Sequence, residues 1–401
     1  MYDLIVIGGG AGGVFGAISA KAANPHAKVL LLEKSGVLLS KVKISGGGRC
    51  NVTHGCFEPK MLTERYPRGS KELIGPFHRF QPRNTIEWFE SRGVNIKIEE
   101  DGRAFPVTDR SQTIIDTLLQ EASKLGVEIL LRQKINVVSK NDKEFLIERL
   151  EGESLTSTHL LLATGSSPEG WKWAEEFGHT INPPVPSLFT FNSPSSSLKE
   201  LSGISVDPTE VNVLGTARVE RGPLLITHFG FSGPAVLKLS AWEARHLHTC
   251  DYRFKISINW LPNYSSSQIC AELMHAKTDS PAKPLSERLF GLPKNLWRAL
   301  LQEKCDKRAN DLTAKELQLL AHRLHADIYS IEGKTTHKEE FVTCGGVKLS
   351  EIDFKTMESK ITPGLFFAGE ILDIDGITGG FNFQNAWTSA YIAGSALQKI
   401  K

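Results

Sequence analysis

The sequence contains no long apolar run, and this absence limits where the chain can reside. No stretch reaches the roughly 18 consecutive apolar residues that a membrane-spanning helix needs. No basic segment precedes the apolar first residues, so we expect no signal peptide. Six cysteines are scattered without a C-x-x-C pair, which favours reduced thiols. We therefore expect a cytoplasmic protein without a membrane partner.

Net charge is also low. The chain has 47 Lys and Arg against 45 Asp and Glu, a formal charge of +2, which argues against nucleic acid as a partner. Its 401 residues exceed the usual size of one domain, and a hydrophobic content of 40% is that of an ordinary globular protein. The sequence leaves the oligomeric state open.

The first residues predict a strand, a glycine turn and a helix. Asp3 to Ile7 is a short apolar run typical of a buried parallel strand. Gly8, Gly10 and Gly13 then form G-x-G-x-x-G at the start of a helix. These glycines permit a tight turn, close approach of the backbone to a pyrophosphate, and close packing of helix on strand. The N–H groups at the helix start can hold a phosphate.

A second strand with an acidic end completes this βαβ unit. Val29 to Leu32 is apolar, and Glu33 follows it, where a carboxylate accepts a hydrogen bond from an adenosine ribose hydroxyl. Glu33 argues against a 2′-phosphate at this position. The alternative is a structural glycine turn followed by a chance acid.

The next stretch is unusually rich in glycine. Residues Lys41 to Thr53 include Gly46, Gly47 and Gly48, which disfavours a helix or a regular strand. Three consecutive glycines suggest backbone close to a flat or charged ligand. A flexible surface loop is the alternative, but the adjacent Arg, Cys and Asn favour a ligand loop.

The remaining pattern predicts an interrupted α/β domain. Thr158 to Ala163 is a strand ending in Ala163-Thr164-Gly165, as at the carboxyl edge of a parallel sheet. Three prolines after it suggest a boundary, and short strand candidates follow. They are Ser187–Phe191, Val211–Leu214 and Phe254–Asn259.

The helical part of this insert begins near residue 265 and ends near residue 330. Thr313 and Glu316 form a capping box there. Strand–glycine–helix character returns near residue 343, with a final helix from about 383 to 398. We expect an FAD-type domain in residues 1–186, a β-rich insert in 187–342, and the second part of the first domain in 343–401.

Several motifs resemble one known family. Ser45 to Asn51 reads S-G-G-G-R-C-N, Gly102 to Pro106 reads G-R-A-F-P, and Thr227 to Pro234 reads T-H-F-G-F-S-G-P. Ala368 to Asn382 contains A-G-E and D-G-I-T-G-G-F-N. These elements resemble bacterial flavoproteins described as aminoacetone-oxidase-like or as NAD(P)/FAD-dependent oxidoreductases, within the glutathione-reductase-like FAD superfamily.

The resemblance implies an α/β, Rossmann-like FAD-binding domain interrupted by a β-rich insert with a helical part. FAD is the expected cofactor, and NAD(P)H a possible transient reductant; we expect no metal. The glycine turn and the resemblance together indicate cofactor-binding residues in three groups. From the N-terminal unit these are Gly8, Gly10, Ala11, Gly12, Gly13, Glu33 and Lys34. From the glycine-rich stretch they are Lys43, Ser45, Gly46, Gly47, Gly48, Arg49, Cys50 and Asn51. From the later segments they are Ala163, Thr164, Gly165, Gly369, Glu370, Gly379, Gly380, Phe381 and Asn382.

The catalytic residues remain open at this stage. Arg49 could bind an acid or the flavin, His228 could act as acid or base, and Cys50 could be a redox thiol. Each also has a structural alternative: a surface arginine, a structural histidine and a small packed residue. We expect two-electron redox chemistry on a small organic substrate, with reoxidation by oxygen or NAD(P). An RNA-modifying flavoprotein and a non-catalytic flavin sensor are the alternatives.

Overall fold

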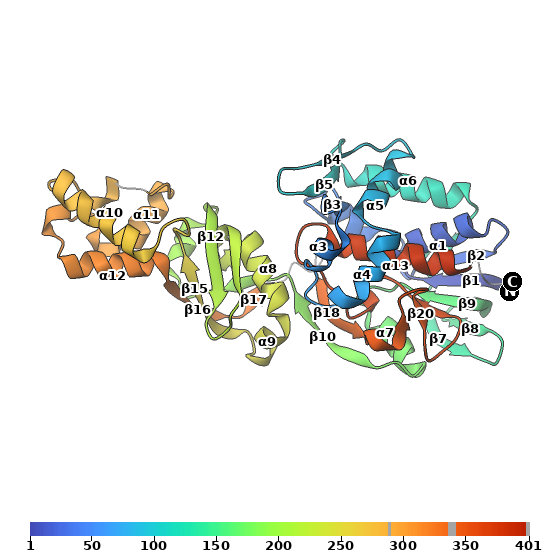
Figure 1. Cartoon of the computed structure of the whole chain (residues 1–401). Helices are drawn as coiled ribbons and strands as arrows, with labels where there is room; N and C mark the ends of the chain where they lie inside the picture. Colours follow the sequence, from blue (N-terminus) through green and yellow to red (C-terminus); the bar gives the residue numbers. More distant parts are fainter. Residues whose placement is uncertain (288–289, 336–341, 398–401) are drawn as a thin grey trace. The chain divides into compact units, whose positions relative to one another are not determined.

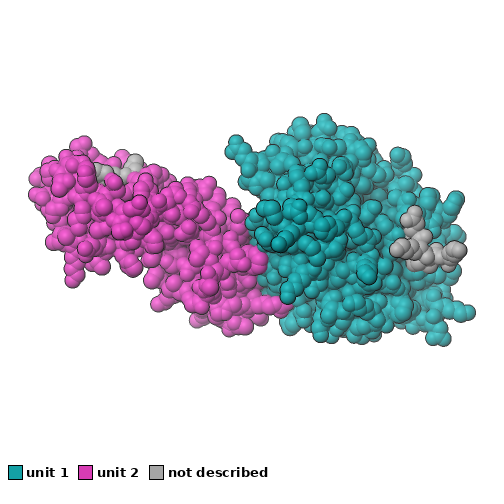
Figure 2. Space-filling model, in the orientation of Figure 1, with its two compact units in different colours: residues 1–187, 338–401 teal, residues 188–337 magenta. Residues whose placement is uncertain are grey.

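The computed structural model describes residues 1–287, 290–335 and 342–397. The chain divides into two compact units, residues 1–187 with 338–401 and residues 188–337 (Figure 2). Both ends of the chain contribute to unit 1, whereas unit 2 is one continuous segment. The predicted fold class, an α/β domain with an insert, is therefore confirmed.

A nine-stranded sheet with a parallel centre forms the core of unit 1. Strand β1 (Tyr2–Ile7) lies between β2 (Val29–Leu32) and β9 (Leu155–Leu162) and pairs in parallel with both. On the far side of β9 lies β21 (Leu365–Phe367), from the C-terminal part of the chain. Strand β2 is buried along its whole length, as expected for a strand covered on both faces. The other strands are β6 (Glu128–Leu130), β7 (Ile135–Lys140), β8 (Phe145–Arg149), β19 (Ile352–Asp353) and β20 (Glu358–Ser359).

Two helices from opposite ends of the chain pack together on this sheet. They are α1 (Ala11–Ala23) and α13 (Phe381–Ala396), drawn side by side in Figure 1. A Cβ added to Gly394 would lie 2.5 Å from the carbonyl oxygen of Gly16, so the two backbones touch at this crossing. Small residues on the final helix thus let the C-terminal segment pack directly on α1.

The glycine-rich stretch begins with a helix, which the sequence did not predict. Helix α2 (Ser40–Ile44) covers its first residues, so the expectation of irregular structure from Lys41 onward is wrong there. The stretch ends in β3 (Thr53–His54), which pairs with β5 (Arg103–Pro106), and β5 pairs with β4 (Ile96–Ile98). Helix α6 (Ser111–Lys124) follows. The other helices of unit 1 are α3 (Pro59–Thr63), α4 (Ser70–Arg79), α5 (Pro82–Glu90) and α7 (Pro168–Glu176).

The proline-rich segment forms a strand directly before the division between the two units. Strand β10 (Ile181–Ser187) pairs antiparallel with β18 (Val342–Val347), with a register shift between Asn182 and Val185 that accommodates the prolines. The single strand predicted over Ser187–Phe191 is wrong. Leu188 has a φ of 56°, and the next strand, β11 (Thr190–Asn192), belongs to a different sheet.

Unit 2 combines an antiparallel sheet with helices around one hydrophobic core. Its seven strands, in spatial order, are β16 (Asp327–Glu332), β15 (Arg253–Asn259), β12 (Ser205–Val213), β13 (Val219–Ile226), β14 (Gly230–Ser232), β11 and β17 (Lys334–Thr335). Its helices are α8 (Pro234–Trp242), α9 (Ala244–Thr249), α10 (Ser266–Asp279), α11 (Lys294–Leu301) and α12 (Ala314–His325). The predicted capping box is confirmed, with Thr313 and Glu316 bonded reciprocally. Among the described residues, no helix has the length and apolarity to span a membrane.

Candidate cofactor and active site

The turn between β1 and α1 has the close contacts that its glycines predict. Gly8 has a φ of 113°, and a Cβ there would lie 2.4 Å from the carbonyl oxygen of Ala163. A Cβ on Gly13 would lie 1.8 Å from the carbonyl oxygen of Gly8, so only glycine lets the helix pack on the strand. A Cβ on Gly10, by contrast, would meet no atom within 4 Å. The helix start therefore presents bare, open backbone, as an approaching phosphate requires.

Glu33 is held against this turn. Its Oε2 accepts a hydrogen bond of 2.7 Å from the N–H of Gly9, and its Oε1 accepts one of 2.7 Å from the N–H of Ser35. The carboxylate is partly exposed and fixed beside the helix start. This position suits acceptance from a ribose hydroxyl.

The residues that follow β9 and β21 lie close to the start of α1. A Cβ on Gly12 would lie 3.5 Å from the carbonyl oxygen of Ala368. The Oγ1 atom of Thr164, after β9, is buried without a hydrogen-bond partner among the described residues. Gly165 follows with a φ of 60°. The Thr164 hydroxyl packs against α7, because a Cβ on Gly170 would lie 1.9 Å from it.

Glu370 joins three segments of the site. It lies in the short helix η6 (Gly369–Ile371), and its Oε1 accepts a hydrogen bond of 3.0 Å from the N–H of Thr343. Its Oε2 lies 2.6 Å from Nζ of Lys41 in α2. Nζ of Lys41 also lies 3.5 Å from Oγ of Ser166. Glu370 was among the predicted site residues, but Lys41 was not, because nothing in its local pattern distinguishes it from neighbouring lysines.

The three glycines after α2 form an open left-handed run. Gly46, Gly47 and Gly48 have φ values of 58°, 69° and 83°. A Cβ on Gly47 or Gly48 would meet no atom within 4 Å. Ser111 anchors the run, because its N–H donates to the Gly48 carbonyl at 2.8 Å and its Oγ donates to the Lys43 carbonyl at 2.7 Å. This loop is thus fixed from one side and bare on the other.

Arg49 is paired within unit 1. Its guanidinium stacks on Phe105, 3.9 Å from the ring centre, and lies 2.7 Å from Glu99 and 3.5 Å from Asp109. The hydrogen bond that Arg49 donates to Glu99 raises the pKa of Arg49. Asp109 in turn lies 2.5 Å from Lys97, whose hydrogen bond lowers the pKa of Asp109. Two carboxylates thus balance the positive charge of Arg49 and fix its position.

Cys50 is a buried thiol. Its side chain is fully buried, and burial raises its pKa to about 12. A thiol with this pKa is almost entirely protonated at neutral pH and is therefore a poor nucleophile. The burial of Cys50 favours a role as a small packed residue over a role as a redox thiol.

Asn51 connects the glycine loop to the start of α13. In the orientation that satisfies its amide, the oxygen of Asn51 accepts from the N–H of Gly380 at 2.9 Å, and the nitrogen donates to the Thr53 carbonyl at 2.9 Å. A Cβ on Gly380 would lie 2.5 Å from that same Thr53 oxygen. Asn382 bonds both backbone groups of Gly376 at 2.8 and 2.9 Å. The bare backbone at Gly380 therefore serves packing on β3.

The residues flanking Gly380 are packed against aromatic neighbours. Gly379 has a φ of 133°, and Phe381 stacks on His54 with ring centres 4.7 Å apart. The hydroxyl of Tyr66 donates to the carbonyl oxygen of Phe381 at 2.7 Å. These contacts fix the first turn of α13.

Three further side chains have simpler surroundings. Lys34 forms an exposed ion pair with Glu169 at 3.4 Å. Arg103, in the β4–β5 hairpin, pairs with Asp101 at 2.6 Å and with Glu99, the partner of Arg49, at 3.2 Å. His228 lies on an exposed turn of unit 2, before β14.

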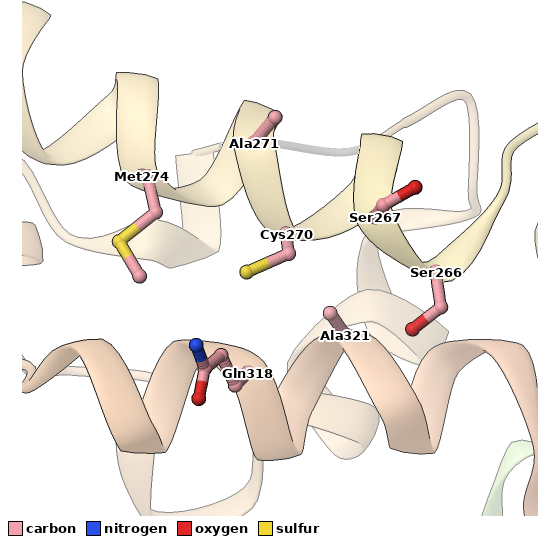
Figure 3. A pocket seen from close by; sticks show the side chains of 7 residues that line it. All are labelled: Ser266, Ser267, Cys270, Ala271, Met274, Gln318 and Ala321. Atoms are coloured by element: carbon pink, nitrogen blue, oxygen red, sulfur yellow. The ribbon is translucent and has the colours of Figure 1, made fainter.

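Unit 2 also contains a pocket between α10 and α12, with a volume of about 550 Å³. Cys270 and Met274 extend from one helix toward Gln318 of the other (Figure 3). It is lined by Ser266, Ser267, Cys270, Ala271, Met274, Gln318 and Ala321. None of the residues predicted for cofactor binding contributes to it.

The residues at the start of α1 fit the ADP half of FAD. The open Gly10 and the fixed carboxylate of Glu33 lie at one end of the parallel sheet. Ligands bind at this carboxyl edge in open α/β sheets. The open side of Gly47 and Gly48 offers room for a flat ring.

Comparisons with known proteins agree with this geometry. A family model for the HI0933-like protein Rossmann domain matches residues 2–396. The chain is 32% identical to a ribosomal RNA dihydrouridine synthase of Escherichia coli, over 100% of this chain and 99% of that protein. It is 28% identical to a 3-dehydro-bile acid delta(4,6)-reductase of Clostridium scindens, over 99% of both chains. The solved 3-ketosteroid delta1-dehydrogenase of Sterolibacterium denitrificans shares the fold, with a TM-score of 0.53, 10% identity and 100% coverage of both chains.

The nucleotide-binding turn, the interrupted α/β unit and these similarities define a class of protein. The chain is an FAD-dependent oxidoreductase. Within that class it belongs to the HI0933-like Rossmann family. The predicted resemblance to NAD(P)/FAD-dependent oxidoreductases is thereby confirmed.

Proposed function

We propose that the protein uses FAD to reduce a carbon–carbon double bond conjugated to a carbonyl group. The supporting observation is similarity along the full chain to two proteins whose names describe related changes. One is named a delta(4,6)-reductase of a 3-dehydro-bile acid, and the other a dihydrouridine synthase. Dihydrouridine differs from uridine by two hydrogens across a ring double bond that is conjugated to a carbonyl. The same bond type therefore accounts for both names.

Bound FAD would supply the hydride chemistry. The Gly8–Gly13 turn binds the diphosphate through backbone N–H groups, and Glu33 orients the adenosine ribose. The Gly46–Gly48 run offers bare backbone to a flat ring, and Ser111 keeps that run in place. Arg49 stabilises the adjoining loop through Phe105 and its two carboxylates.

Few groups on this chain suit the delivery of a proton to the substrate. Reduction of the double bond adds a hydride to one carbon and a proton to the other. Cys50 is buried and Arg49 is ion-paired, so neither suits this role. We assign the proton to solvent, with NAD(P)H as the transient reductant of the cofactor.

The substrate is a small enone or, as the second candidate, a uracil base in RNA. Similarity to the dihydrouridine synthase favours the second candidate. The charge of unit 2 gives no further support for an RNA substrate, because this unit contains 18 Lys and Arg against 15 Asp and Glu. RNA binding ordinarily uses a stronger positive field.

Anaerobic single-turnover mixing tests this proposal. Holoprotein reduced with dithionite is mixed with a steroid dienone, with free uridine or with ribosomal RNA, and flavin absorbance is followed. We expect one of these acceptors to reoxidise the flavin rapidly and to gain two hydrogens by mass spectrometry. A flavin that stays reduced with all three acceptors, or that reoxidises without an acceptor product, would contradict the proposal.

A further inference from the structure

We propose that Lys41 and Glu370 form a clasp across the FAD site that slows release of the cofactor. This inference rests on the FAD assignment of the proposed function, but not on the identity of the substrate. The two side chains meet at 2.6 Å, although 329 residues separate them in the chain. This ion pair connects α2 with η6.

Both halves of the clasp are anchored to the nucleotide-binding turn. The N–H of Leu39, just before α2, donates to the Gly9 carbonyl at 2.8 Å. On the other side, the Ala368 carbonyl and the Gly369 nitrogen lie 3.5 and 3.7 Å from the Cβ position of Gly12. The open Gly10 lies between these two anchors in the sequence. A diphosphate bound at the helix start is therefore flanked by both elements that the ion pair connects.

The carboxylate of Glu370 is well placed to hold the clasp shut. Its second oxygen is fixed by the N–H of Thr343, and its side chain is 20% exposed. Lys41 is 45% exposed, so its ammonium can leave the pair without a large desolvation change. Glu370 on η6 is thus the fixed partner of the ion pair, and Lys41 on α2 is the partner that can move.

The sign of one substitution distinguishes a clasp from simple charge effects. If Glu370 acted only through its charge, Glu370→Gln would remove repulsion from the anionic FAD and slow its release. The clasp predicts the opposite, faster release in both Glu370→Gln and Lys41→Met. We expect an increase of roughly threefold to fivefold, the size typical of a lost, partly exposed ion pair. The double variant should release FAD no faster than the single variants.

The experiment follows FAD fluorescence after dilution of the holoprotein, with rate constants compared among wild type, both single variants and the double variant. The matched control removes an exposed ion pair elsewhere in unit 1, through Lys172→Met and Glu176→Gln. Added salt should accelerate release from wild type toward the rate of the variants. Thermal unfolding of each apoprotein reports any general loss of stability.

Slower release of FAD from Glu370→Gln would overturn the clasp. Additive effects of the two substitutions on the release rate would overturn it as well. The salt dependence of wild type keeps the idea testable where a variant fails to fold, and a salt-independent release rate would contradict it. Absence of bound FAD in wild type would instead contradict the FAD assignment itself.

Discussion

The side-chain oxygen of Asn51 accepts a hydrogen bond from the N–H of Gly380 at 2.9 Å. This contact joins the glycine-rich loop of the N-terminal half to the first turn of α13 in the C-terminal half. The N–H of Gly380 is thus already satisfied by the protein. A direct role of that N–H at a flavin ring is correspondingly disfavoured, and the open backbone of Gly47 and Gly48 is the better candidate.

Gly10 and Gly13 should respond differently to substitution. Gly10 has a φ of −80° and open space at its Cβ position, so Gly10→Val should fold normally and lack FAD. Gly13→Ala places a Cβ against the Gly8 carbonyl and should lower the free energy of unfolding by at least about 1–3 kcal/mol. Thermal unfolding of the apoproteins and flavin absorbance of the purified proteins measure the two effects. Full FAD occupancy in Gly10→Val would remove Gly10 from the site.

Arg49→Lys should change the flavin environment as well as stability. Lysine keeps the charge but loses the planar stacking on Phe105, which should cost about 0.5–1 kcal/mol. Arg92→Lys is the matched control, because Arg92 stacks on Trp88 at 3.9 Å and pairs with Glu121 at 2.8 Å. A redox titration should show a shifted flavin potential for Arg49→Lys only. Equal potentials in the two variants would place Arg49 outside the influence of the flavin.

Cys50 should be chemically silent in the folded protein. Because burial raises its pKa to about 12, iodoacetamide should leave Cys50 unmodified at neutral pH and label it only in denaturant. Cys50→Ala should keep FAD and turnover while losing some stability from the vacated volume. Peptide mass mapping and single-turnover kinetics check these outcomes. Loss of turnover with full FAD occupancy would instead identify a redox thiol.

Acidification should destabilise unit 1 through His179. The imidazole is buried between Oγ of Ser359 at 2.7 Å and Oε2 of Glu351 at 3.2 Å, and burial lowers its pKa below 6.5 despite the opposing effect of Glu351. Because the unfolded chain binds the proton more readily, this stability is present above pH 6.5 and is lost as pH falls through the folded pKa. We expect a slope of up to about 1.4 kcal/mol per pH unit in urea titrations.

The variant His179→Gln is the control for this pH dependence. It has no titrating ring, so the difference in slope between wild type and variant isolates His179. Parallel curves for the two proteins would show that other groups cause the acid sensitivity.

The sequence predicted the parts of the fold that rest on local patterns. The β1–α1–β2 unit lies within the continuous segment 2–32, and the Thr313 capping box depends on residues three positions apart; both are confirmed. The strand over Ser187–Phe191 was wrong because a single left-handed residue, Leu188, divides it, and leucine gives no sign of such a φ. Proline at 183, 184 and 186 suggested a boundary, and the two compact units divide directly after this segment, between Ser187 and Leu188. The strand β10 over these prolines was not predicted, and a register shift accommodates them in it.

The side-chain contacts of the site were harder to predict from the sequence. The close contacts at Gly8 and Gly13 follow from steric limits and could be anticipated, whereas the packing of Gly380 on β3 could not. The partners of Arg49 and Glu370 could not, because Glu99 lies 50 residues from Arg49 and Lys41 lies 329 residues from Glu370. Such pairs depend on how distant elements pack, and a single sequence contains no local signal for them.

The most direct test of the central claim is a stoichiometric anaerobic titration. Fully reduced holoprotein is mixed with increasing amounts of the acceptor that reoxidises it fastest among the dienone, uridine and ribosomal RNA. The account predicts one two-hydrogen product formed for each flavin reoxidised. A flavin that stays reduced with all three acceptors, or that reoxidises without forming such a product, would contradict it.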